Sequence, residues 1–187
     1  MNQAMEMTQE QVQAPKRTFN KRLTFYHPNS KGTGSAMQLE LRMNRQDEDR
    51  YDCFFLEMAN QKSSGQPRNG GGRAHATFDW ENKATVKLDF MDVCEFLGVL
   101  EGRRAQAGNG KAGIYHEAGG TNTLISLNRN EERGGYFLGV SRKSKNDGAV
   151  LFKGSMLLTE SEALGLRCVF QTSLFFLTFN RNLREGC

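Results

Sequence analysis

Hydrophobic and polar residues alternate strictly in the first half of the chain. The hydrophobic positions of the clearest run are Met37, Leu39, Leu41 and Met43. The residues between them are polar or charged, which is the period-2 pattern of a half-buried strand. Similar runs predict further strands over 19–26, 51–60 and 84–88.

The hydrophobic period changes to 3.6 after the last of these runs. The residues that share one helical face are Val93, Phe96, Leu97 and Leu100. Asp89 is placed to cap the first turn, because its short side chain can accept hydrogen bonds from free backbone N–H groups. The first half is therefore predicted to contain strands followed by one helix.

The second half repeats this order. Strands are predicted over 111–117, 121–128, 134–143 and 149–156, and a helix over 160–179. The helix begins with a capping box formed by Thr159 and Glu162. The segments 88–93 and 158–163 correspond closely, so we infer a four-strand-plus-helix unit used twice in an α+β fold.

Low-complexity stretches mark the limits of this pattern. The Gln-rich start is expected to be a disordered tail, and residues 61–73 a flexible loop between strands. The expected segments are a tail over 1–15, one domain over 16–180 with halves 16–104 and 110–180, and a tail over 181–187.

The last predicted helix is hydrophobic nearly all round. One stripe contains Leu166, Val169, Phe170, Leu174 and Leu177, and a second contains Leu164, Cys168, Phe175 and Phe179. Such a helix needs an apolar partner on both sides. We expect the first stripe to form an oligomer interface; the alternative is that loops of the same subunit cover the helix.

Composition and length indicate a protein without membrane spans or metal sites. The chain has 187 residues, and no run approaches the roughly 20 apolar residues that cross a bilayer. Its polar start lacks the basic and apolar regions of a signal peptide. The four cysteines are widely separated, which favours neither a zinc site nor a disulfide framework.

The charge is unevenly distributed along the chain. The net charge is only +4, but residues 103–154 hold nine Lys/Arg against four Asp/Glu. Basic and aromatic residues also interleave, which is typical of surfaces that bind single-stranded nucleic acid through phosphates and stacked bases. Phe137 lies within this pattern, and the candidate binding residues are Lys21, Arg22, Phe25, Tyr26, Lys111, Tyr115, Tyr136, Arg142, Lys143 and Lys145.

Catalytic patterns are missing from the sequence. The three histidines, His27, His75 and His116, lie in different segments, and no nucleophile elbow or zinc-protease motif occurs. The acidic run Asp47–Asp49 is more typical of a solvated turn than of a metal site. We therefore expect no catalytic residues, no metal and no cofactor, and a protein that is not an enzyme.

Several segments resemble the Whirly single-stranded-DNA-binding proteins, which are related to transcriptional coactivators of the positive-cofactor-four type. The segments that carry this resemblance are 31–37 (KGTGSAM), 78–83 (FDWENK), 86–88 (VKL), 92–97 (DVCEFL), 115–117 (YHE) and 158–163 (LTESEA). The first occupies the place of the family's Lys-Gly-Lys-Ala-Ala-Leu segment and adds Lys31 to the candidate binding residues. The family's second Lys has no counterpart among Thr33, Gly34 and Ser35.

The resemblance implies a particular architecture and assembly. It implies two four-stranded antiparallel sheets packed against each other with two helices, and a homotetramer formed through the helical side. It also implies nucleic acid bound along sheet edges between subunits, with little sequence preference.

The favoured function is therefore single-stranded DNA binding with little sequence specificity. We expect a cytoplasmic or nucleoid-associated protein that protects or organises exposed strands in replication, recombination or repair. Two alternatives stay open: an RNA-binding protein of the same fold, and a protein-assembly module that binds no nucleic acid.

Overall fold

The computed structural model describes residues 22–42, 52–65, 75–109 and 112–179. The expected tails over 1–15 and 181–187 lie outside these ranges, as do the candidate binding residues Lys21 and Lys111.

The first half forms an antiparallel sheet. Its strands are β1 (Leu23–His27), β2 (Ser35–Arg42), β3 (Cys53–Ser63) and β5 (Ala84–Leu88), paired in the order β1-β2-β3-β5. A short strand, β4 (Thr77–Phe78), pairs with the far end of β3 and was not predicted. Two residues are too few to show a hydrophobic period, so the sequence pattern does not predict this strand.

The second half forms a four-stranded antiparallel sheet in the order β6-β7-β8-β9. Its strands are β6 (Ile114–Ala118), β7 (Thr121–Arg129), β8 (Tyr136–Ser144) and β9 (Val150–Leu158). One helix follows each sheet, α1 (Phe90–Leu100) and α2 (Glu160–Phe179). The α+β fold with two antiparallel sheets and two helices is confirmed.

Both helices begin with the predicted caps. Asp89 accepts hydrogen bonds from the backbone of Met91 and Asp92, and the Asp92 carboxylate accepts one from the Asp89 N–H. At α2, the Thr159 hydroxyl accepts from the Glu162 N–H, and the Glu162 carboxylate accepts from the Thr159 N–H. Each capping box satisfies backbone donors that a helix N-terminus otherwise leaves free.

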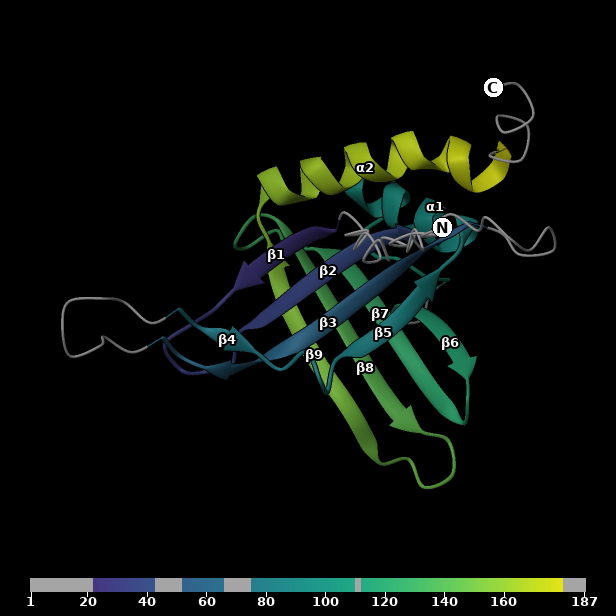
Figure 1. The fold of residues 1–187 in the computed structure, drawn as a ribbon. Helices are drawn as coiled ribbons and strands as arrows, with labels where there is room; N and C mark the ends of the chain where they lie inside the picture. Colours follow the sequence, from purple (N-terminus) through teal and green to yellow (C-terminus); the bar gives the residue numbers. More distant parts are fainter. Residues whose placement is uncertain (1–21, 43–51, 66–74, 110–111, 180–187) are drawn as a thin grey trace, which may run out of the picture.

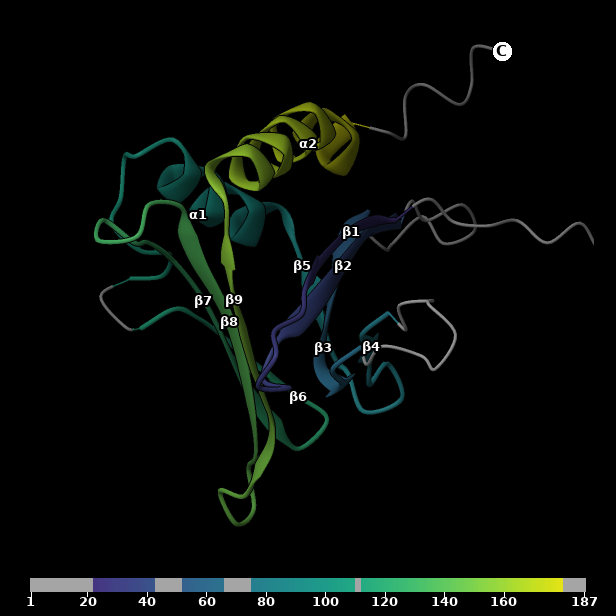
Figure 2. The same ribbon diagram turned by 90° about the vertical axis from the view of Figure 1, so that its left-hand side faces the viewer.

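The two sheets form a V, with both helices in its wide end (Figures 1 and 2). The sheets meet where β9 packs against β2 and β3. The inner faces carry the hydrophobic core, and Phe170 of α2 packs edge-on against Phe54 and Phe96. The core thus joins both halves of the chain.

The first stripe of α2 faces the core of its own chain, and the second is the more exposed one. Leu166, Phe170 and Leu177 are buried in the core of the same chain, and Val169 and Leu174 pack against that core. Leu166, Phe170 and Leu177 therefore have almost no surface left for an oligomer interface, and for these three residues the assignment is corrected. The exposed residues belong to the second stripe, Leu164, Cys168, Phe175 and Phe179.

Candidate nucleic-acid interface

The outer face of the β6–β9 sheet, which we call the second outer face, presents rows of side chains that run across the strands. Strand register defines three of them. The rows are Tyr115–Leu124–Ser141–Lys153, Ser126–Gly139–Ser155 and Asn128–Phe137–Leu157. The middle row is made of small residues, and we call this strip of small residues between two rows of larger ones the trough.

Gly139 shapes the floor of this trough. A Cβ atom at this position would lie 2.7 Å from the Ser126 Oγ and 3.3 Å from the Phe137 Cε1. The Phe137 ring therefore lies against the space that a side chain at position 139 would fill. One part of the ring packs on the sheet while 37% of the residue stays exposed to solvent.

Positive charge on the second outer face comes mainly from lysines. Lys143 and Lys153 are exposed, and neither side chain has an ion pair or hydrogen bond within the described part of the chain. Lys145 instead forms an ion pair with Glu117, and that hydrogen bond raises the pKa of the lysine. Among the described residues of this face, Lys143 and Lys153 are thus the lysines without an ion pair.

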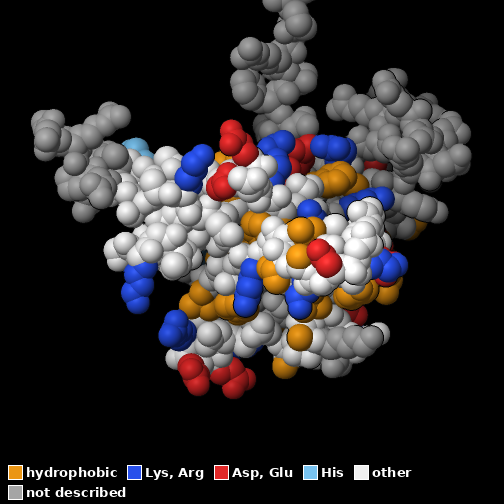
Figure 3. Space-filling model, turned by 90° about the horizontal axis from the view of Figure 1, so that it is seen from below, with side chains coloured by type: hydrophobic (Ala, Val, Ile, Leu, Met, Phe, Trp, Pro, Cys, Tyr) orange, Lys and Arg blue, Asp and Glu red, His pale blue; other side chains and the backbone are white. Residues whose placement is uncertain are grey.

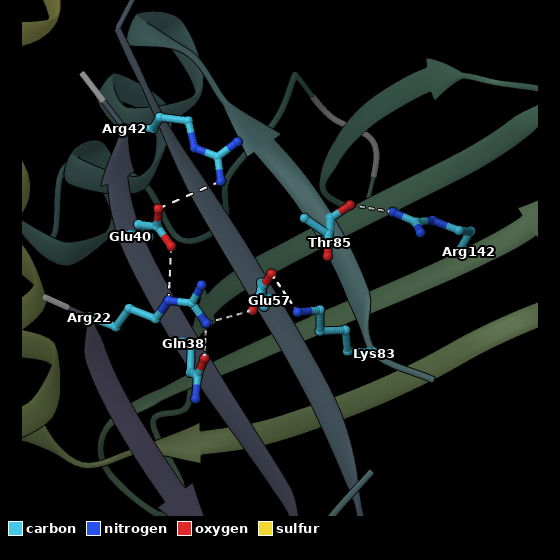
Figure 4. Close-up of polar contacts among 8 residues, drawn as sticks. All are labelled: Arg22, Gln38, Glu40, Arg42, Glu57, Lys83, Thr85 and Arg142. Carbon is cyan, nitrogen blue, oxygen red and sulfur yellow. Dashed lines mark hydrogen bonds and ion pairs between the residues drawn. The ribbon is translucent and has the colours of Figure 1, made fainter. Parts of the chain in front are cut away.

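The outer face of the first sheet, which we call the first outer face, is also charged but is internally neutralised (Figure 4). Glu40 lies 2.8 Å from the Arg22 Nε and 3.6 Å from Arg42, and Glu57 lies 2.8 Å from the Lys83 Nζ. Arg42 also stacks over the Phe55 ring at 4.5 Å. Most of this charge is engaged within the sheet.

An aromatic pair lies at the β4 end of the first outer face. The rings of Tyr26 and Phe78 are 5.5 Å apart, and Tyr26 is 55% exposed. Lys31 is exposed in the turn between β1 and β2. These groups offer a ring and a cation, but they belong to the outer face of the other sheet.

Three predicted binding residues do not face solvent as expected. Tyr136 is buried, and its hydroxyl donates to the Leu100 carbonyl at 3.4 Å. Phe25 packs against the core on the inner face of the first sheet. Neither ring can stack on a base without leaving the core, so both assignments are corrected.

Arg142 is the third residue whose predicted role changes. Its Nε donates to the Thr123 hydroxyl at 3.1 Å, and its Nη2 donates to the Thr85 carbonyl of the first sheet (Figure 4). The guanidinium therefore ties the two sheets together. It belongs to the inner face of the second sheet, where its donors are engaged within the protein.

The strand period could have found these differences. Tyr136 and Arg142 have the same parity as the buried Leu138 and Val140, whereas Phe137, Lys143 and Gly139 have the opposite parity. Lys153 follows in the same way from β9, where Phe152, Gly154 and Met156 point inward. Composition alone had pointed to Tyr136, Phe137, Arg142 and Lys143 together, without separating the two faces of the strand.

The end of the molecule away from the helices carries positive and hydrophobic side chains together. Figure 3 views this end and shows Lys and Arg side chains dispersed among hydrophobic ones. Among the described residues, no three His, Cys, Asp or Glu side chains gather where they could hold a metal ion. Neither described helix is long and apolar enough to cross a lipid bilayer.

The fold defines the class of protein: two antiparallel sheets and two helices arranged as in the Whirly proteins. The structure of WHY3 from Arabidopsis thaliana superposes with a TM-score of 0.66 at 15% identity, over 90% of this chain and 94% of that one. The structure of WHY1 from the same plant superposes with a TM-score of 0.67 at 16% identity, over 90% of each chain.

A third solved structure agrees with these two. The plant transcriptional regulator PBF-2 superposes with a TM-score of 0.64 at 14% identity, over 89% of this chain and 86% of that one. No family model and no curated protein matches the sequence. The predicted Whirly-like fold is thus confirmed by structure.

Proposed function

We propose that this protein binds single-stranded DNA with little sequence preference, across the second outer face. The observation that carries the proposal is the trough of small residues between the rows that contain Tyr115 and Phe137. Similarity to the Whirly structures supports it, since the sequence resemblance to that family implies the same ligand.

The trough has the shape and chemistry that an unpaired strand needs. Bases of a single strand can lie flat on aromatic rings, and such stacking is worth about 1–3 kcal/mol per base whatever the sequence. Tyr115 and Phe137 are both exposed and flank the small residues. Duplex DNA hides its base faces within the stack, so exposed rings on a sheet favour the single strand.

The free lysines supply the phosphate contacts. Lys143 and Lys153 lie on the same face as the two rings, on neighbouring strands β8 and β9. A lysine that has no carboxylate partner can neutralise a phosphate without first breaking an ion pair, and the release of counterions favours binding. Binding should therefore weaken steeply as salt is added.

An oligomer is part of the same proposal, formed through the second stripe of α2. Leu164, Phe175 and Phe179 are each more than half exposed, and the Phe175 and Phe179 rings are 5.5 Å apart. Exposure of such an apolar patch to water is unfavourable, and a second copy of the chain packed on it would bury it. A homotetramer would place several second outer faces around one helical centre.

In cells, this activity would protect or organise exposed strands during replication, recombination or repair. No observed geometry requires a catalytic role, so we propose a binding protein that is not an enzyme. RNA is the nearest alternative ligand, because rings and lysines contact features that RNA and DNA share.

Titration of a fluorescein-labelled oligothymidylate by anisotropy tests the proposal. We expect binding at about 50 mM salt and a log–log dependence on salt whose slope is about −0.7 for each phosphate contacted. An oligouridylate competitor separates DNA from RNA binding. Absence of binding at low salt would reject the function.

The oligomer is tested by the native mass of a Phe175→Glu variant. The charge would face the apolar contact, so we expect a smaller assembly with an unchanged circular dichroism spectrum. Glu101→Gln, a change outside the stripe, is the control and should keep the wild-type mass. If the Phe175→Glu variant keeps it as well, α2 is not the interface.

A further inference from the structure

A hollow of about 620 Å³ lies at the end of the second sheet, between the segment that follows α1 and the turn that joins β7 to β8. Its lining residues are Gly102, Arg104, Ala105, Asn128, Arg129, Asn130, Glu131 and Glu132. Ligand pockets commonly have volumes of roughly 300–1,000 Å³, so the hollow is large enough for one small planar group.

One wall of this pocket is held firmly. The Ala107 N–H donates to the Leu127 carbonyl at 2.9 Å, and the Arg129 N–H donates to the Ala105 carbonyl at 3.2 Å, so residues 105–107 extend the edge of the sheet. Arg104 crosses Gly98 of α1 and hydrogen bonds with Glu95. The pocket is therefore a formed feature of the fold.

The pocket also contains hydrogen-bonding groups that have no partner within the described ranges. The side chains of Arg129, Asn128, Glu131 and Glu132 make no hydrogen bond or ion pair there. Two of them offer N–H donors, and the other two are carboxylates that only accept. A ligand that fills the pocket must satisfy both kinds.

The pocket adjoins the row that contains Phe137 at one residue, Asn128. Asn128 lines the pocket and also pairs in register with Phe137, on the same outward row. A base that leaves the stack beyond Phe137 therefore reaches the pocket next. The carboxylates of Glu131 and Glu132 need N–H donors, which a base edge offers and a phosphate lacks, so a base is the group that satisfies the pocket.

We propose that this pocket takes one base of the bound strand and prefers guanine. The inference rests on the proposed function, because the trough delivers the strand. Guanine presents its O6 acceptor beside the N1–H and N2–H donors on one edge. Arg129 or Asn128 donates to O6, while Glu131 or Glu132 accepts from the two N–H groups.

The other bases fit this arrangement less well. Adenine and cytosine turn an unprotonated ring nitrogen toward the carboxylate, and thymine flanks its single N–H with two carbonyl oxygens. Each would leave a carboxylate facing an acceptor. The trough remains tolerant of sequence, and the pocket adds a preference at one position.

Anisotropy with the full chain and three labelled oligomers tests the inference. The oligomers are oligothymidylate, the same strand with guanosines placed singly at regular intervals, and the same strand with inosine at those positions. We expect the guanosine strand to bind about tenfold more tightly than oligothymidylate, since a bidentate base contact discriminates by about this factor or more. Inosine lacks the N2 amine and should lose most of the gain.

The double variant Glu131→Gln, Glu132→Gln should remove the guanine preference and leave oligothymidylate binding in place. Glu81→Gln removes a charge from an exposed turn of the first sheet and serves as the matched control, which should keep the preference. Equal wild-type affinities for all three strands would overturn the inference alone, as would a preference that survives in the double variant. Failure of oligothymidylate itself to bind would overturn the proposed function, and the inference with it.

Discussion

The two halves of the molecule match where they pack and differ where they face solvent. In each half, a histidine of the first strand contacts the capping carboxylate of the other half's helix. His27 of β1 lies 2.8 Å from Glu162 of α2, and His116 of β6 lies 3.0 Å from Asp92 of α1. These reciprocal pairs preserve the inner architecture of the duplicated unit.

The outer faces have diverged. The first outer face neutralises its own charge through Glu40 and Glu57, whereas the second leaves Lys143 and Lys153 free beside exposed rings. Packing constrains the inside of both halves in the same way, because a change there disturbs the common core. The outside is free to change, so the difference between the two faces is the better guide to function.

Reversal of charge on the second outer face should have the largest effect. The Lys143→Glu, Lys153→Glu variant replaces two attractions for phosphate by two repulsions, and we expect affinity for oligothymidylate to fall about a hundredfold at low salt. The salt slope should become smaller by about 1.4. Anisotropy measures both quantities.

Lys87→Glu is the matched control, because Lys87 is an exposed lysine on the first outer face. It should change affinity much less than the double variant. Equal losses from the two faces would erase the functional difference that we infer between them.

Loss of the Phe137 ring should have the next largest effect. Phe137→Ala removes one stacking platform, so we expect about tenfold weaker binding with an unchanged salt slope. Phe55→Ala removes a ring from the first outer face and is the control. If both variants bind like the wild type, the trough does not stack bases.

Neutralising an acid on the first outer face should leave that face with a free lysine, as on the second outer face. Glu57→Gln frees Lys83 from its 2.8 Å ion pair, and we expect nucleic-acid affinity to rise about threefold at low salt. Lys83 would then be free to contact phosphate. Unchanged affinity would show that charge alone does not distinguish the faces.

The smallest effect concerns the reciprocal pairs. The hydrogen bond to Asp92 raises the pKa of His116 above its usual 6.5, although burial opposes this. The raised pKa stabilises the fold fully below about pH 6.5, and this stability is lost as pH rises through the folded-state value. His116→Gln should remove this pH dependence, which we expect to be worth about 1 kcal/mol, or roughly 2–4 °C in Tm.

Thermal melts between pH 6 and pH 9 measure this difference. His75→Gln, at an exposed histidine outside both pairs, is the control and should melt like the wild type. The pKa of Glu162 is shifted in the opposite direction, so its contribution to stability has the opposite dependence on pH. Burial opposes its ionisation, but hydrogen bonds from His27 and Thr159 outweigh this and lower its pKa, so its contribution is lost as pH falls.

Local patterns predicted most of the elements well. The strand over 84–88 and the helix over 160–179 coincide with β5 and α2, and the cap at Asp89 and the capping box at Thr159 formed as expected. β1 was expected over 19–26 but spans Leu23–His27, because element ends depend on pairing with a neighbour strand. The Whirly-like fold followed from the order of these elements together with the family resemblance.

The candidate site was only partly predictable. Lys143, Tyr115 and Tyr26 are exposed as expected, whereas Tyr136 is buried although it follows the same composition. Lys153 was missed although the alternation of β9 places it on the outer face. The role of Gly139 was missed because it depends on the cross-strand neighbours Ser126 and Ser155, which only the register shows.

Sequence by itself determined the period, the caps and the duplication, since these depend on residues close together in the chain. Tertiary structure decided which stripe of α2 enters the core. The two stripes are similarly hydrophobic and have the same helical spacing, so only packing against the sheets distinguishes them. It also decided that Glu40 and Glu57 of the first outer face pair with basic side chains of that face, while Lys143 and Lys153 of the second have no ion pair among the described residues. Contacts across the two halves bring distant residues together, and no local pattern records them.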